Sequence, residues 1–130
     1  LIDQNSGGDI IFNVTKQAVN PGMNFGSYGL PKASLFFLVK PLALALGTYN
    51  ITVNGINADK IKSGLLNDKL IKARSKSRGV SEEKYMKGNL LKKEVLAEDV
   101  AKGFLSLVKS KKTTAHVFTV DGGNIESSLR

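Results

Sequence analysis

The chain of 130 residues contains no cysteine, no tryptophan and a single histidine, His116. Without cysteine it forms no disulfide and offers no thiolate as a nucleophile or metal ligand. The carboxylates that remain as candidate ligands show no cluster, so we expect no metal site. His116 lacks catalytic partners in the pattern, and we expect it to be structural or exposed. The absence of cysteine fits a reducing compartment, and we predict a cytoplasmic location.

A long uninterrupted apolar run and a leader-like N-terminus are also lacking. The stretch from Leu35 to Val39 continues from Leu42 to Leu46, but Lys40 and Pro41 interrupt it, so we expect a core helix too short to span a bilayer. The first nine residues carry acids and glycines rather than a basic end followed by an apolar stretch. The first residue is not Met, and we expect a segment of one domain cut from something longer.

Acidic residues are scarcer than basic ones, with 11 Asp and Glu against 19 Lys and Arg and a formal charge of +8. Such an excess is typical of nucleic-acid-binding proteins, because Lys and Arg neutralise phosphates. The positive charges, however, run from Lys60 to Lys112 among several acids and form no long basic block. Solvated helical faces therefore explain the pattern better than a nucleic-acid-binding module, which stays a less favoured alternative.

Strand and helix patterns alternate along the chain. Strands are predicted for Ile10 to Val14, Asn50 to Ile56 and Ala115 to Val120, an ordered loop for residues 16–27, helices from Tyr28 to Leu46 and Ala97 to Ser110, and two helix starts at Ser63 and Ser81. In the first helix Pro31 is tolerated in the first turn, and Pro41 should kink the helix or end its regular part. The order of elements predicts an α/β fold with a parallel sheet and right-handed crossovers.

One group of side chains is suited to proton transfer. Tyr28 and Lys32 are four residues apart, so on a helix they share one face. An ammonium beside a phenol lowers the phenol pKa toward the range of a general acid/base. Thr15, at the end of the first strand, offers a hydroxyl to a substrate oxygen, and Gln17 and Asn24 in the following loop are suited either to substrate contact or to turn building.

The order of these motifs resembles the second half of the short-chain dehydrogenase/reductase family. The resemblance covers the whole chain and rests on four motifs: Thr15, Tyr28-Gly29-Leu30-Pro31-Lys32-Ala33-Ser34, Ile51-Thr52-Val53-Asn54-Gly55-Ile56-Asn57 and Val120-Asp121-Gly122-Gly123. It implies the C-terminal half of a Rossmann-like doubly wound parallel sheet, with about three strands and covering helices. It also implies an oxidoreductase that interconverts an alcohol and a carbonyl with NAD or NADP.

The resemblance assigns roles residue by residue. Tyr28 is implied to protonate or deprotonate the substrate oxygen, Lys32 also to hold the nicotinamide ribose, and Thr15 to stand where the family has a Ser thirteen residues before the Tyr. The strand exit, usually Asn-Pro-Gly, is here Asn57-Ala58-Asp59-Lys60-Ile61. The resemblance implies that these residues and Ser63 contact the cofactor. Ile61 would lie near the nicotinamide amide, and Ser63 would replace a family Thr near the phosphates. Tyr85 and Met86 either cover the substrate pocket or pack.

Two stretches are similar to a narrower group, bacterial proteins that fuse a rhamnulose-phosphate aldolase to a short-chain dehydrogenase. They are Asn13 to Gly22 and Asn57 to Gly64. This similarity implies a small hydroxy-aldehyde such as lactaldehyde as the substrate.

No Gly-x-Gly-x-x-Gly turn occurs in the chain, so we expect the N-terminal dinucleotide-binding half to be absent and residues 1–130 alone to be inactive. In the complete protein we expect a homo-oligomer that pairs through the apolar helix and binds no membrane. A noncatalytic fragment of the same fold is the alternative.

Overall fold

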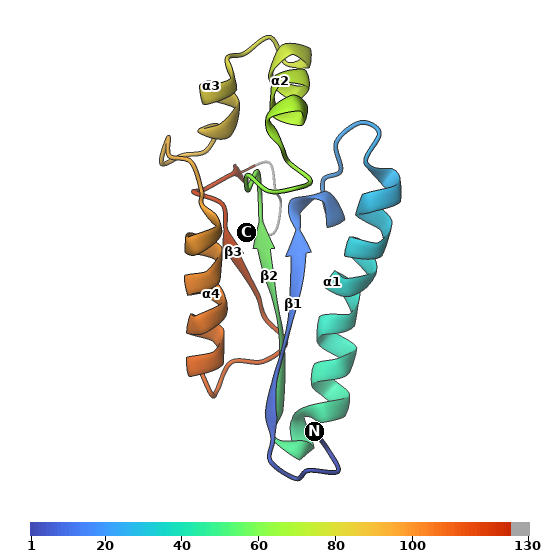
Figure 1. Ribbon diagram of the computed structural model, residues 1–130. Coiled ribbons are helices and arrows are strands. Elements are labelled where there is room, and N and C mark those ends of the chain that lie inside the picture. The colour runs from blue at the N-terminus through green and yellow to red at the C-terminus, as the bar shows by residue number, and fades with distance from the viewer. Residues whose placement is uncertain (126–130) are drawn as a thin grey trace.

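The structure, a computed structural model, describes residues 1–125 (Figure 1). Its strands are β1 (Gly8–Thr15), β2 (Ile51–Ala58) and β3 (Val117–Val120), and its α-helices are α1 (Gly26–Leu46), α2 (Asp68–Ser77), α3 (Glu82–Met86) and α4 (Ala97–Lys109). Two short 3₁₀ turns, η1 (Lys16–Ala18) and η2 (Gly47–Tyr49), follow β1 and α1. All three predicted strands are therefore confirmed, as is the helix predicted from Ala97.

The three strands form one parallel sheet in the order β1-β2-β3. β1 pairs with β2 from Gly8 opposite Ile51 to Thr15 opposite Ala58, and β2 pairs with β3 as far as Val120. The central strand, β2, is almost wholly buried, as expected for a parallel strand covered on both faces. The arrows in Figure 1 all point toward the end of the molecule where α2 and α3 lie. This arrangement confirms the predicted Rossmann-like α/β fold.

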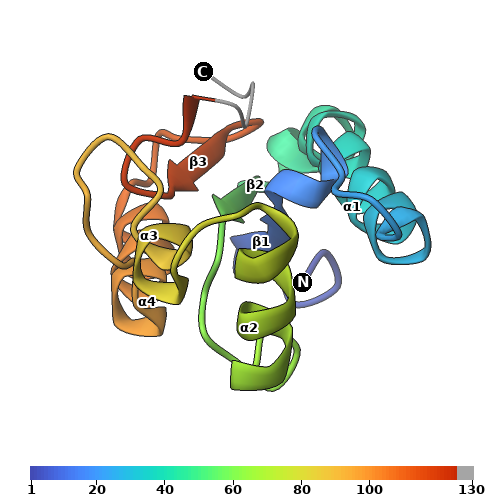
Figure 2. The same ribbon diagram turned by 90° about the horizontal axis from the view of Figure 1, so that it is seen from above.

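Helices α1 and α4 cover opposite faces of the sheet, as the view along the strands shows (Figure 2). Small residues bring the layers close. A Cβ on Gly55 would lie 3.1 Å from Val14 Cγ2 and 3.4 Å from Val39 Cγ2 of α1, and one on Gly103 of α4 would lie 3.0 Å from Val120 Cγ2. Successive side chains of β2 point to opposite faces of the sheet, so they pack under α1 on one face and under α4 on the other.

The segment between β2 and α4 carries two short helices beyond the strand ends. Asn67 caps α2 by accepting from Leu70 N at 3.0 Å, and Ser81 caps α3 by accepting from Lys84 N at 3.1 Å. The helix start predicted at Ser81 is confirmed, whereas the one at Ser63 is wrong. Ser63 Oγ accepts from Leu66 N at 3.1 Å, and this hydroxyl closes a turn rather than starting a helix.

Helix α1 differs from its prediction in three ways. It begins at Gly26, so Pro31 lies in the second turn, and it continues through Pro41 to Leu46. It is also not a core helix, because the sheet covers only one of its sides. The opposite side exposes Leu30 and Phe37 at 72% each and Leu44 at 83%. These three residues, seven apart, form a stripe that we call the outer α1 stripe.

The continuous helix also corrects the expectation about bilayer length. Within the described residues, the segment Gly26–Tyr49 is long and apolar enough to cross a membrane by length and composition alone. The interruption at Lys40 and Pro41 does not shorten it. Since α1 packs along β1 and β2, its position is that of a helix covering a sheet, and the cytoplasmic location stays a prediction.

Candidate active site at the strand ends

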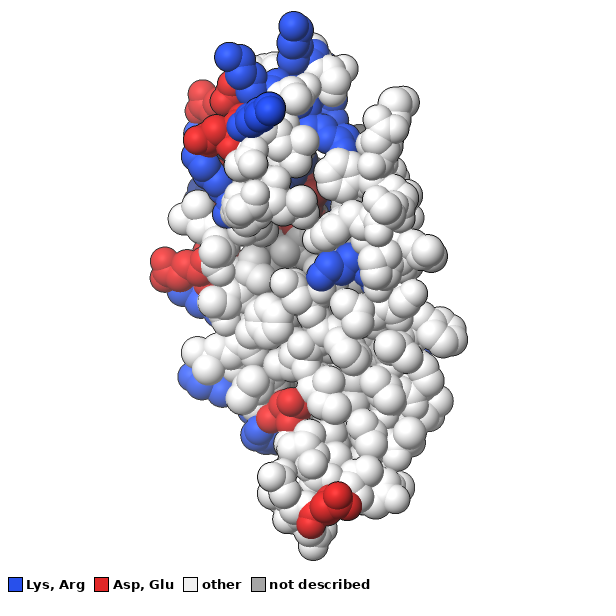
Figure 3. Space-filling view, turned by 45° about the vertical axis from the view of Figure 1, so that its right-hand side comes forward, with Lys and Arg blue, Asp and Glu red and all other residues white. Residues whose placement is uncertain are grey.

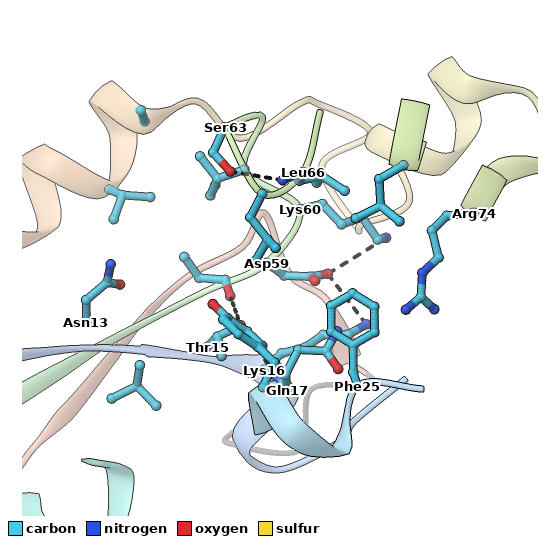
Figure 4. A pocket seen from close by; sticks show the side chains of 18 of the residues that line it. Asn13, Thr15, Lys16, Gln17, Phe25, Asp59, Lys60, Ser63, Leu66 and Arg74 are labelled. Atoms are coloured by element: carbon cyan, nitrogen blue, oxygen red, sulfur yellow. Dashed lines mark hydrogen bonds and ion pairs between the residues drawn. The ribbon is translucent and has the colours of Figure 1, made fainter. Parts of the chain in front are cut away.

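A cavity of 320 Å³ opens at the carboxyl ends of β1 and β2, below α2 and α3 (Figure 4). Open parallel α/β sheets bind their ligands at this edge. The cavity brings together residues from before α1 and its first turn with residues from after β2, as far as the start of α4: Asn13, Val14, Thr15, Lys16, Gln17, Phe25, Tyr28, Ala58, Asp59, Lys60, Ile61, Ser63, Leu65, Leu66, Leu70, Arg74, Arg78, Tyr85, Ala97 and Val100.

Thr15 and Tyr28 both line this cavity, as the sequence predicted. Thr15 ends β1 and caps η1. Among the described residues its Oγ1 makes two long hydrogen bonds, donating to the Ala58 carbonyl and accepting from Gln17 N, each at 3.5 Å. Long bonds are weak, so the hydroxyl keeps capacity for another partner. Tyr28 is partly buried near the start of α1, edge-on to the Phe25 ring at 6.0 Å between centroids.

Lys32 lies one turn after Tyr28 and on the same side of α1. Its Nζ donates to the Asn13 carbonyl at 2.8 Å and lies 5.8 Å from the centre of the Tyr28 ring. Lys32 is not among the residues that line the cavity, but Asn13 is. The ammonium is therefore held at the edge of β1 beside the phenol rather than released into solvent.

Asp59 stands at the position where the resembled family has Gly, and its carboxylate joins a buried charge cluster. Lys16 Nζ lies 3.6 Å and Lys60 Nζ 3.8 Å from its Oδ2, and Asn124 Nδ2 donates to the same oxygen at 2.5 Å. Only 7% of the Lys16 side chain and 9% of the Asp59 side chain are exposed. This pair, visible as dashed lines in Figure 4, fixes η1 to the end of β2.

A second tyrosine, Tyr85 of α3, also lines the cavity. This position is compatible with the first of its two predicted roles, covering the substrate pocket. Burial raises the pKa of its phenol above the ordinary value of 10.0, and the nearby Arg78 opposes this shift. A phenol that holds its proton more firmly is a poor base near neutral pH. Met86, in contrast, belongs to an apolar cluster with Ile71 and Tyr85 and does not line the cavity, which favours the packing role.

The two loop residues predicted to contact substrate differ in their places. Gln17 lines the cavity, but its Oε1 accepts from Gly22 N at 2.7 Å and so holds the loop. Asn24 is exposed, has a φ of 65° and lies outside the cavity lining. Its left-handed backbone favours the turn-building alternative.

Most, but not all, of the residues after β2 that were expected to contact the cofactor line the cavity. Ala58, Asp59, Lys60, Ile61 and Ser63 line the cavity, whereas Asn57 does not. The Asn57 side chain is fully buried, and within the described chain neither its Nδ2 nor its Oδ1 has a hydrogen-bond partner. Buried amides are normally paired, so this one indicates an unfilled interaction close to the site.

These residues fit the nicotinamide end of a dinucleotide. The cavity offers hydroxyls from Thr15 and Tyr28 and backbone groups after β2, which are the donors and acceptors that an amide and a ribose need. The adenine end finds no such fit, because the chain has no Gly-x-Gly-x-x-Gly turn between a strand and a helix.

Sequence reasoning did not pick out Phe25, Arg74 and Arg78. Arg74 lies in α2, Arg78 is the C-cap residue directly after it, and both line the cavity. Their spacing signals a shared helix face. Only the packing of α2 over the strand ends shows that this face points to the site.

The open parallel sheet, with a strand-end hydroxyl and a Tyr and Lys at the start of the next helix, defines part of a Rossmann-like oxidoreductase domain. Residues 3–124 match a family described as enoyl-(acyl carrier protein) reductase. The chain belongs to the short-chain dehydrogenase/reductase family.

Similar proteins are found among curated sequences and solved structures. The chain is 31% identical over 128 residues to the uncharacterized oxidoreductase YuxG of Bacillus subtilis, covering 92% of this chain and 19% of that protein. It is 29% identical over 132 residues to the NADPH-dependent reductase BacG of the same organism, covering 98% of this chain and 51% of BacG. A short-chain dehydrogenase family protein from Francisella tularensis has a TM-score of 0.76 at 27% identity, covering 92% of this chain and 52% of its own. The chain thus spans about half of BacG and of the Francisella protein and about a fifth of YuxG.

Proposed function

We propose that the complete protein is an NAD- or NADP-dependent oxidoreductase that interconverts an alcohol and a carbonyl, with Tyr28 as the general acid/base. The observation that carries this proposal is the meeting of Thr15 and Tyr28 in one cavity, with the Lys32 ammonium beside the Tyr28 ring. The nicotinamide cofactor, when bound, donates or accepts the hydride. The name of BacG records NADPH for that relative, and the choice between NAD and NADP for this chain stays open.

The residues of this chain handle the substrate oxygen and its proton. Tyr28 Oη gives a proton to the oxygen when a carbonyl is reduced and takes it back when an alcohol is oxidised. Thr15 Oγ1, weakly engaged in the structure, donates a hydrogen bond to the same oxygen and orients it. Lys32, held by the Asn13 carbonyl, stabilises negative charge that develops on the Tyr28 oxygen. The raised pKa of Tyr85 argues against Tyr85 as the base.

The substrate that the sequence implies is a small hydroxy-aldehyde such as lactaldehyde, as part of an aldolase and dehydrogenase fusion. The relative YuxG supports the fusion, because a chain covering only 19% of it leaves room for another domain. The cavity of 320 Å³ fits a small molecule. The alternative of a noncatalytic fragment predicts no turnover with any carbonyl.

Paired substitutions in the complete protein test the assignment. Tyr28→Phe removes the hydroxyl and should lower turnover by at least about 10²–10⁴-fold, the usual contribution of a general acid/base. Thr15→Val should also lower turnover, whereas Thr15→Ser should retain most of it. Tyr49→Phe, at a half-exposed tyrosine beyond the other end of α1, is the control. Unchanged oxidation of NADPH or NADH by Tyr28→Phe would refute the role of Tyr28.

We also propose that the complete protein is a homo-oligomer in which a second subunit covers the outer α1 stripe. The stripe exposes three large apolar side chains in a row along α1. Exposed apolar patches of this kind mark contact sites in soluble proteins. The isolated residues 1–130 should aggregate or associate, because β1 is also an open edge strand among the described residues.

A further inference from the structure

The walls of the cavity carry more positive than negative charge. Among the described residues, Lys16, Lys60, Arg74 and Arg78 line it and Asp59 is the one lining carboxylate, which leaves these residues with a formal excess of three positive charges. In Figure 3 the Lys and Arg side chains gather at the end of the molecule formed by α2 and α3, with Asp and Glu among them, whereas the face below shows few charges. A cleft lined by one sign of charge concentrates ligands of the opposite sign.

The two arginines differ from the lysines in how their charge is balanced. Lys16 and Lys60 both share the Asp59 carboxylate. Within the described part of the chain, no carboxylate forms an ion pair with Arg74 or Arg78, although exposed lysines of the same segment, such as Lys62 and Lys87, do find acidic partners. Among residues 1–125, therefore, no carboxylate neutralises the charge on the α2 side of the cavity.

Both guanidinium groups are instead placed over aromatic rings. Arg74 Cζ lies 4.2 Å from the centre of the Phe25 ring, and Arg78 Cζ lies 5.3 Å from the centre of the Tyr85 ring (Figure 4 shows Arg74 beside Phe25). Arg74 uses Nη2 to donate to the Met23 carbonyl at 3.3 Å. A guanidinium has five N–H donors in its plane, so stacking and one such bond leave donors directed along the plane for a ligand.

We propose that this site takes a substrate that carries a carboxylate or phosphate group, bound by Arg74 and Arg78 at the α2 side while the reacting carbon lies at Thr15 and Tyr28. The proposal rests on the proposed oxidoreductase function and adds its substrate class. Arg is suited to both groups because its planar fork matches two oxygens of either one. A neutral hydroxy-aldehyde such as lactaldehyde would leave these donors unused, so its charged relatives are the better substrates.

The test compares matched carbonyl compounds in the complete protein. Acetoacetate is paired with methyl acetoacetate, and dihydroxyacetone phosphate with dihydroxyacetone, so that each pair differs mainly in charge. We expect kcat/KM to favour the anionic member of at least one pair, and the pair identifies the carboxylate or the phosphate. In Arg74→Gln combined with Arg78→Gln, kcat/KM for that anion should fall about tenfold to a hundredfold, as expected for charged hydrogen bonds. The neutral member should change little.

Further variants separate ligand binding from structure. Lys76→Gln removes the same charge from an exposed position of α2 outside the cavity and should leave the anion preference unchanged. Arg74→Lys keeps the positive charge but loses the planar guanidinium. Its kcat/KM for the anionic substrate should lie between those of the wild type and of Arg74→Gln. A purely structural role for Arg74, through the Met23 carbonyl, predicts equal losses for anionic and neutral substrates and would overturn the proposal.

Cofactor phosphates are the other source of an anion, and binding measurements distinguish them. In calorimetry the double Arg variant should bind NADH with the same affinity as the wild type does. The same should hold for NADPH. Weaker cofactor binding with an unchanged substrate preference would overturn the proposal. If the protein reduces no carbonyl at all, the oxidoreductase assignment fails. Titration of acetoacetate and inorganic phosphate then still decides the anion site, because binding that the double variant loses supports it and no binding to the wild type refutes it.

Discussion

Replacing Asp59 by Asn should destabilise the protein far more than removing an ordinary surface carboxylate. Asp59 pairs with Lys16 at 3.6 Å and with Lys60 at 3.8 Å, and the side chains of the three residues are between 7% and 12% exposed. Loss of the carboxylate leaves the Lys16 ammonium buried without its counter-charge. Removing one partner of a buried ion pair costs about 3–5 kcal/mol. Because both distances are longer than a direct charged hydrogen bond, we expect a cost of about 3 kcal/mol.

Burial, rather than distance, is the basis of this expectation, and Asp68→Asn is the matched control. Asp68 lies only 2.7 Å from Lys62, but the two side chains are 79% and 59% exposed, so water solvates both charges. Exposed ion pairs contribute about 0–1 kcal/mol. The double variant Lys16→Met with Asp59→Asn removes the stranded charge and should recover at least about 1 kcal/mol of the loss through coupling.

The assay is urea denaturation of the complete protein followed by circular dichroism, at one protein concentration for all variants. The slope of the unfolding free energy against urea should stay constant, so that a shift in midpoint reports stability. Equal costs for Asp59→Asn and Asp68→Asn, or a double variant no more stable than Asp59→Asn alone, would refute the reasoning. In that case the cluster is solvated and contributes no more than a surface pair.

Two further predictions concern α1. Gly29→Ala should lower both stability and turnover, because its Cβ would lie 2.8 Å from the Gln17 backbone carbonyl oxygen and push α1 with Tyr28 away from η1. Gly26→Ala is the control and should be neutral or slightly stabilising, because its Cβ meets nothing within 4 Å. Equal behaviour of the two variants in thermal melts and kinetics would contradict this prediction. Phe37→Glu places a charge in the outer α1 stripe and should convert the oligomer to smaller species in light scattering. Lys76→Glu, at an exposed position of α2 away from α1, should not. An unchanged mass for Phe37→Glu would exclude the stripe from the interface.

Local chemistry made much of the fold predictable. An apolar run after turn residues indicated β1, alternating β-branched residues indicated β2, and a stretch closed by Asp-Gly-Gly indicated β3. Ser81 followed by two Glu residues indicated the start of α3. These signals act within a few residues, so the sequence carries them. The prediction at Ser63 failed because a Ser before an apolar stretch closes a turn as readily as it caps a helix. The exposure of α1 could not be predicted from its composition, since burial depends on which neighbours cover it.

For the site, the sequence by itself determined the chemical groups: a hydroxyl at Thr15 and a phenol and ammonium one helical turn apart at Tyr28 and Lys32. The tertiary structure alone decided what surrounds them. It placed Arg74 on Phe25, 49 positions away in the sequence, and buried Asp59 between Lys16 and Lys60. The reason is physical: a helix or strand fixes spacings between near neighbours, whereas contacts between distant segments follow from how the layers pack, which no local pattern records.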